Sequence, residues 1–79
     1  MELKYGILGK IKEGKNIGWF VKFTDDREHS GGFYIYEFKD VEGKEGFDTW
    51  LETENDVKGY INENEWIIEW LTEHQAKFK

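Results

Sequence analysis

The densest group of chemically capable side chains in this sequence is the run from Asp25 to Gly32, which reads DDREHSGG. Hard carboxylate oxygens beside one imidazole could hold a divalent cation, but their spacing matches no zinc or calcium loop. His29 could act as a base beside Asp26 or Glu28, yet no nucleophile with a base and an orienting group is visible. A solvated turn is therefore the favoured interpretation, and a metal-dependent hydrolase using Asp25, Asp26, Glu28 and His29 is the remote alternative.

The glycine pair that ends this run does not form a phosphate-binding motif. Phosphate loops precede a helix whose N-terminus meets the anion, whereas Gly31 and Gly32 precede a strand-like run, as a turn needing positive φ would. The chain has no cysteine, which excludes disulfides, thiolate zinc sites and cysteine nucleophiles. We expect no enzymatic activity, no metal and no cofactor.

The elements that hold this turn in place must fit within one small domain. A chain of 79 residues buries too little surface to build two cores. Aromatic residues make up 18% of it, so a few large rings must fill the core. The expected core rings include the four tryptophans, Trp19, Trp50, Trp66 and Trp70.

The first half of the chain, residues 3–38, is rich in predicted strands. Apolar residues recur every second position in 3–11 and again in 17–23, and the run 33–38 is dense in aromatic and β-branched residues. Short polar segments at 13–16 and 25–32 separate these runs. The pattern predicts a three-stranded antiparallel meander.

The second half predicts a strand, a helix and a closing strand within residues 47–71. A loop over 39–46 leads into a short strand at 47–51, and Thr53 with Asp56 three residues later resembles a helix-start capping box. Val57, Tyr60 and Ile61 then share one helix face. Residues 65–78 fit both a strand followed by a tail and a single helical stripe, and we favour a strand over 65–71 with a tail at 72–79. The fold class is α+β, an antiparallel sheet of three to five strands with one helix on a face.

The predicted meander is apolar on both faces, and one helix cannot cover both. If Trp19, Val21, Phe33 and Ile35 point inward, the opposite face carries Leu8, Phe20, Tyr34, Tyr36 and Phe38. Aromatic patches rimmed by charge are typical of recognition surfaces. The alternative is that the tail, with Phe78, folds over this second face.

Charge is concentrated in the second half of the chain. Residues 1–39 carry 7 basic and 6 acidic side chains, whereas residues 40–79 carry 4 and 11. This field repels nucleic acid and favours a basic protein partner, which we expect to meet Asp48, Glu52, Glu54 and Asp56. A charge that serves solubility alone is the competing interpretation. The chain shows neither a signal peptide nor a membrane span, so a cytoplasmic location without membrane contact is expected.

The stretch from Asp26 to Ile35 resembles a local pattern in small immunity proteins of bacterial polymorphic toxin systems, in which an Asp, Glu-His-Ser and a Gly lead into an apolar strand. The runs 46–50 and 66–70 are also similar to small bacterial proteins with a strand, a helix and a closing strand. This resemblance implies a protein that neutralises a cognate toxin by covering its active site, and an acidic member suits a basic nuclease cleft.

Two functional hypotheses follow. The leading one is an acidic protein-binding domain that neutralises a toxin through Asp48, Glu52, Glu54 and Asp56 together with the rings of Tyr34, Tyr36 and Phe38. The alternative is an accessory or interaction module that forms a homodimer by burying its two-faced sheet.

Overall fold

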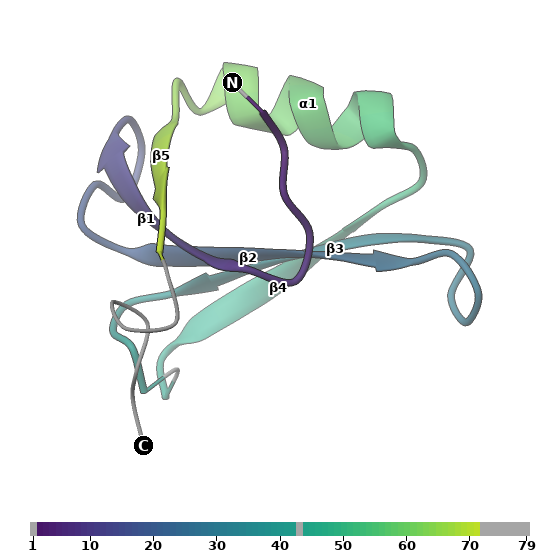
Figure 1. The fold of residues 1–79 in the computed structure, drawn as a ribbon, viewed down its shortest axis with the longest axis horizontal. Coiled ribbons are helices and arrows are strands. Elements are labelled where there is room, and N and C mark those ends of the chain that lie inside the picture. The colour runs from purple at the N-terminus through teal and green to yellow at the C-terminus, as the bar shows by residue number, and fades with distance from the viewer. Residues whose placement is uncertain (1, 43, 72–79) are drawn as a thin grey trace.

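The protein is an α+β domain, and the computed structural model describes residues 2–42 and 44–71. Five antiparallel strands form one sheet in the order β4-β3-β2-β1-β5. Figure 1 shows the single helix lying over one face of this sheet, here called the inner face. In chain order the elements are β1 (Leu8–Glu13), β2 (Phe20–Asp26), β3 (Gly32–Phe38), β4 (Gly46–Leu51), α1 (Glu54–Glu63) and β5 (Ile67–Trp70).

The core lies between the helix and the inner face. The predicted inward residues Val21, Phe33 and Ile35 are all buried there, and Val57 and Ile61 meet them from the helix. Each fully buried aliphatic or Phe side chain contributes roughly 1.5–3 kcal/mol relative to an exposed one. The remaining buried members of the cluster are Ile11, Phe23, Trp66 and Ile68. Packing against this single cluster fixes which face of every strand points inward.

The first predicted strand, 3–11, is wrong over its first half. β1 begins only at Leu8, because Gly6 takes a left-handed φ of 76° and turns the chain. Leu3 and Tyr5 leave the sheet and pack against the core cluster. Ile7, one of the alternating apolar residues of the predicted strand 3–11, is 39% exposed.

The second strand also begins later than predicted. The turn after β1 is longer than 13–16, because Gly14, Asn16 and Gly18 all have positive φ, at 104°, 63° and 91°. Ile17 therefore lies in the turn and is 63% exposed. Extended pairing with β3 begins at Phe20.

The predicted helix start is confirmed. Thr53 is the N-cap: its side chain accepts from the Asp56 backbone N–H, and the Asp56 carboxylate accepts from the Thr53 backbone N–H. Val57 and Ile61 are buried and Tyr60 is partly buried, as the helical spacing predicted. With ten residues of mixed polarity, α1 is too short and too polar to cross a membrane, and the described ranges hold no longer helix.

The strand interpretation of the last segment is confirmed where the structure describes it. β5 pairs antiparallel with β1, so the chain crosses from one sheet edge to the other by way of α1. The predicted tail at 72–79, including His74 and Phe78, lies outside the described residues.

Three of the four tryptophans belong to the core, as predicted. Trp66 is buried, and Trp19 and Trp70 are partly buried against the cluster. Trp50 is the exception, since it is 43% exposed. It stands opposite Tyr34 in the β3–β4 register and therefore on the sheet face that α1 does not cover.

Candidate functional site

The face opposite the helix, here called the outer face, carries a row of stacked rings from β3. The Tyr34 and Tyr36 rings lie 5.7 Å apart at 18°, and the Tyr36 and Phe38 rings lie 6.4 Å apart at 3°. Strand alternation places them together, and register adds Phe20 opposite Phe38 and Trp50 opposite Tyr34. We call these five residues, Phe20, Tyr34, Tyr36, Phe38 and Trp50, the aromatic ladder.

The ladder is less exposed to solvent than the sequence pattern predicts. Its three β3 rings are only partly exposed, since each covers part of its neighbour. Leu8 stands opposite Lys22, and so on the same outer face, but only 9% of its surface is accessible. The ladder is therefore a preformed surface of ring edges with a more exposed indole at one end.

Two neighbours fix the position of that indole. The Trp50 Nε1–H donates to the Ser30 hydroxyl at 2.9 Å, which joins β4 to the β2–β3 turn. The ring also lies directly over Gly32, where an added Cβ would come within 2.5 Å of it and closer still to the Leu51 carbonyl. A glycine at this position gives the indole its place on the outer face.

Charge on the outer face runs from acidic to basic across the strands. Lys22, Tyr36 and Asp48 stand opposite one another on β2, β3 and β4. Burial raises the pKa of Tyr36, and the nearby charge of Asp48 adds to the shift, as does that of Asp26. On the β1 side, the Lys10 ammonium lies 5.7 Å from the Phe20 ring centre.

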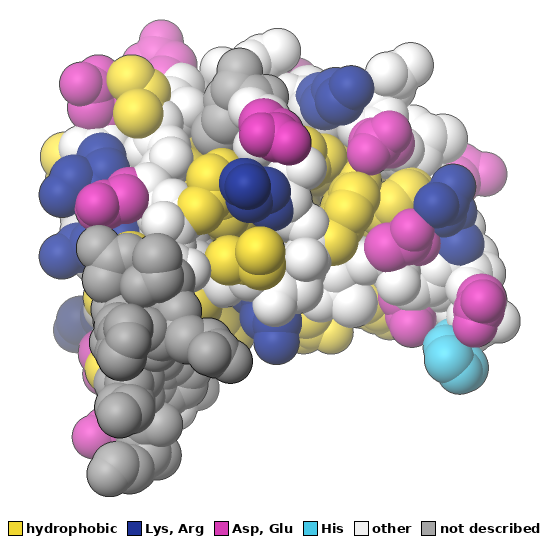
Figure 2. Space-filling view, viewed as in Figure 1, with side chains coloured by type: hydrophobic (Ala, Val, Ile, Leu, Met, Phe, Trp, Pro, Cys, Tyr) yellow, Lys and Arg dark blue, Asp and Glu magenta, His cyan; other side chains and the backbone are white. Residues whose placement is uncertain are grey.

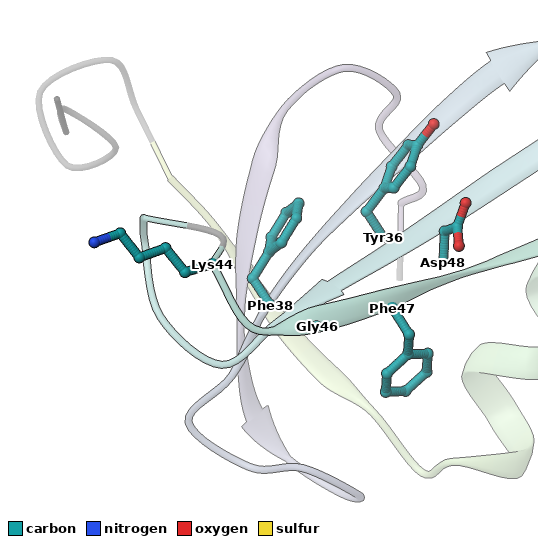
Figure 3. Close-up of a pocket in the computed structure, with 6 residues that line it drawn as sticks. All are labelled: Tyr36, Phe38, Lys44, Gly46, Phe47 and Asp48. Carbon is teal, nitrogen blue, oxygen red and sulfur yellow. The ribbon is translucent and has the colours of Figure 1, made fainter.

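A shallow hollow marks the acidic side of the ladder. It has a volume of about 230 Å³ and lies where β3 meets β4. Figure 3 shows Tyr36, Phe38 and Asp48 on one side of the sheet, with the Phe47 ring on the other. The hollow places a carboxylate beside two rings. Its lining residues are Tyr36, Phe38, Lys44, Gly46, Phe47 and Asp48.

The four carboxylates expected to form one binding surface do not share a face. Asp48 lies on the outer face, whereas Glu54 and Asp56 belong to the first turn of α1, on the inner side. Asp56 completes the capping box, and Glu54 accepts a 2.7 Å hydrogen bond from the Tyr5 hydroxyl. These two carboxylates are therefore bound into the start of α1 and lie apart from Asp48.

The start of α1 instead shares one end of the molecule with the β2–β3 turn (Figure 1). The charge of Glu54 acts on Arg27, and the Tyr5 ring stacks on Phe33 at 5.6 Å while Arg27 lies 5.1 Å over the same ring. Magenta side chains gather at this end in Figure 2. The carboxylates of the two segments form what we call the acidic end: Asp25, Asp26, Glu28, Glu52, Glu54 and Asp56.

The run considered for metal binding and catalysis forms a tight turn. His29 Nδ1 lies 3.4 Å from Asp26 Oδ1 with most of its ring in solvent, and Arg27 makes a two-pronged bond to Asp25. That bond lowers the pKa of the Asp25 carboxyl. The Ser30 hydroxyl donates to the Asp26 carbonyl. Within residues 2–42 and 44–71, no group of three His, Asp or Glu side chains is arranged to hold a metal ion.

A buried carboxylate on the inner face is a feature that we did not predict. Glu37 is only 2% exposed, and its oxygens accept from Tyr60 Oη at 2.9 Å and from Asn16 Nδ2 at 3.2 Å. The sequence pattern does predict its inward position, because Glu37 lies two residues after Ile35 and four after Phe33, on the same face of β3. The network joins the β1–β2 turn, the sheet and the helix, which indicates a structural role.

Comparison with known proteins found no matching protein family, no similar characterised protein and no similar solved structure.

Proposed function

We propose that this chain is a non-enzymatic protein-binding domain that recognises a basic protein partner through the aromatic ladder and the carboxylates beside it. One observation carries the proposal. A row of stacked rings lies on the face opposite the helix, with Trp50 at its open end and Asp48 at its edge.

The ladder suits recognition because its side chains are already ordered. Aromatic rings bury large areas with only two rotatable side-chain bonds to fix, so ordering them on binding costs little entropy. Stacking along β3 and the Trp50–Ser30 bond restrict these rings before any partner arrives. Because the rings are already ordered, less of the favourable contact energy is offset by the entropy lost on binding.

The charge pattern supports a basic partner. Asp26 and Asp48 both act on Tyr36 in the ladder, and the acidic end adjoins it. Carboxylates beside an apolar surface speed the encounter with a positively charged protein and disfavour nucleic acid. The lysines at the β1 side of the face fix which way round such a partner docks.

The most specific form of the proposal is immunity to a toxin. The stretch that resembles immunity proteins, Asp26 to Ile35, spans the end of β2, the turn and the first half of β3. It therefore contributes Asp26, Ser30 and Tyr34 to the proposed surface. Covering a basic active-site cleft of a toxin nuclease would require an acidic, preformed surface of this kind.

The proposal is tested by photo-crosslinking in cells that naturally produce the protein. A photoreactive phenylalanine derivative replaces Tyr34, Tyr36 or Phe38 in turn, with Asn55 and Asn62 on the exposed side of α1 as matched control sites. We expect the three ladder sites to trap the same basic protein and the two helix sites not to trap it. Equal trapping from both faces, or trapping from the helix alone, would contradict the proposal.

A further inference from the structure

The strand β4 forms one edge of the five-stranded sheet. Among residues 2–42 and 44–71 its only pairing is with β3, without a bulge, over all six of its residues. Natural edge strands are usually blunted by proline, lysine, bulges or shortness. β4 reads GFDTWL, in which Asp48 is the single charge, and Phe47 and Trp50 are 49% and 43% exposed.

The alternation of hydrogen-bonded pairs along β3 and β4 shows which backbone groups of β4 face away from β3. The Lys39 N–H donates to the Glu45 carbonyl at 2.9 Å, and this pair continues the β3–β4 register by one residue. Hydrogen-bonded pairs alternate along an antiparallel ladder, so Phe47, Thr49 and Leu51 bond to β3. The N–H and C=O groups of Gly46, Asp48 and Trp50 therefore point outward from the sheet.

We infer that β4 pairs antiparallel with β4 of a second copy of this chain, about a two-fold axis at Thr49. The sheets then join into one of ten strands, with the two outer faces on the same side. This inference concerns the sheet edge. It shares Asp48 and Trp50 with the surface proposed for a partner, but its tests use this chain alone.

Three registers, with the two-fold axis at Asp48, Thr49 or Trp50, keep the outer faces on the same side and bring outward N–H and C=O groups of the two strands opposite each other. Side-chain chemistry favours the axis at Thr49. An axis at Asp48 would set two Asp48 carboxylates directly opposite each other, and an axis at Trp50 would set Asp48 opposite Glu52. Like charges directly opposite destabilise a strand pair. With the axis at Thr49, each Asp48 instead stands opposite a Trp50, and the two Asp48 carboxylates are diagonal neighbours about 7–8 Å apart.

The same register covers the apolar surface at the edge. On the inner face it places each Phe47 opposite Leu51 of the other copy and the two Thr49 side chains opposite each other. Aromatic-aliphatic and Thr–Thr cross-strand pairs each contribute roughly 0.2–1 kcal/mol. Within one chain the Phe47 ring meets Trp19 edge-on, with ring centres 6.3 Å apart, and stays 49% exposed, and the pairing adds Leu51 of the other copy to its contacts.

A cysteine scan tests both the dimer and its register, because the natural chain has no cysteine. The two Thr49 residues would form a non-hydrogen-bonded pair with Cα atoms about 4.5 Å apart, within the range for a disulfide. Under mild oxidation we expect Thr49→Cys to crosslink at least about tenfold faster than Asp48→Cys, Trp50→Cys and the helix control Glu63→Cys, because pairing raises the effective thiol concentration. Fastest crosslinking at position 48 or 50, or equal rates at all four, would overturn the inference.

Sedimentation of the unmodified protein provides the second arm. We expect a reversible dimer at high micromolar concentration that Asp48→Pro abolishes, since proline removes an outward N–H without breaking a bond to β3. Asp48→Asn removes the charge but keeps the N–H, so it should still dimerise. A wild-type monomer at all concentrations up to millimolar would overturn the inference even if the proline variant failed to fold.

Discussion

The indole Nε1–H of Trp50 donates to the Ser30 hydroxyl at 2.9 Å, so a residue of the edge strand is held by the turn between β2 and β3. The two residues are 20 positions apart in the chain. Through this bond, the β2–β3 turn supports the exposed Trp50 ring of the aromatic ladder.

Removing the support should loosen that ring without unfolding the protein. For Ser30→Ala we expect a loss of roughly 0.5–1.5 kcal/mol in the free energy of unfolding, the usual contribution of one hydrogen bond. The indole N–H signal of Trp50 in an NMR spectrum should move, while that of the buried Trp66, which donates to the Lys15 carbonyl, should not. An unchanged Trp50 signal would show that the bond does not form in solution.

The glycine beneath Trp50 should resist substitution. In Gly32→Ala the new methyl group would collide with the Leu51 carbonyl and the indole ring, so we expect a destabilisation of roughly 1–3 kcal/mol from overpacking. Gly59→Ala is the matched control, because nothing lies within 4 Å of its Cβ position and alanine favours a helix. That variant should be more stable by roughly 0.5–1 kcal/mol in urea unfolding. Equal effects of the two changes would contradict this packing.

The buried carboxylate of Glu37 should matter for stability. Glu37→Ala leaves the partly buried Tyr60 hydroxyl and Asn16 amide without this acceptor, and we expect a total loss of roughly 1–3 kcal/mol in the free energy of unfolding. Glu37→Gln keeps one carbonyl oxygen and should lose less. The comparison is made by chemical denaturation at neutral pH, and equal losses in the two variants would show that one amide oxygen cannot replace the carboxylate.

Alkaline pH should weaken the fold through its tyrosines. Burial raises the pKa of both Tyr36 and Tyr60 above the usual value of 10.0, and Tyr5 shifts in the same direction for the same main reason. A raised pKa means that the unfolded chain loses these protons first, so stability holds below pH 10 and falls as pH rises through the folded-state values. Absorbance titration should show these three tyrosines ionising late. Ionisation of all tyrosines together near pH 10 would contradict the burial.

The sequence pattern predicted the fold class, the capping box, β3 and β4 because these depend on local periodicity and on one clear helix start. It failed at the N-terminus, where Leu3, Tyr5 and Ile7 alternate as a strand would but Gly6 turns the chain toward the helix. Periodicity cannot distinguish an apolar residue within a strand from one that lies outside the sheet and packs against the core.

The candidate site was predicted only in part. Tyr34, Tyr36 and Phe38 follow from strand alternation, whereas the placement of Trp50 depends on Gly32 and Ser30, which are distant in sequence. The acidic residues were grouped by their nearness in the chain, but the turn from β4 into α1 carries Glu54 and Asp56 away from Asp48. Charge counts along a chain cannot show which face a carboxylate joins.

Salt should slow the association with a basic partner more than it weakens the complex. Steering between exposed charges is screened over a Debye length of about 8 Å at 0.15 M salt. We expect the pair of changes Asp48→Asn and Glu52→Gln to lower the association rate and its salt dependence, and Glu13→Gln, at the far end of β1, to leave both unchanged. The measurement is stopped-flow binding to the protein trapped at the ladder. An unchanged rate in the double variant would assign the acidity to solubility alone.

The most direct test of the aromatic ladder as the binding surface is the equilibrium dissociation constant for that same trapped partner. Tyr36→Ala, at the centre of the ladder, should weaken binding at least about tenfold, which corresponds to about 1.4 kcal/mol or more. Lys58→Ala, on the exposed side of α1, should bind as the natural protein does. Unaltered binding by Tyr36→Ala, with the variant shown to be folded, would contradict the central claim.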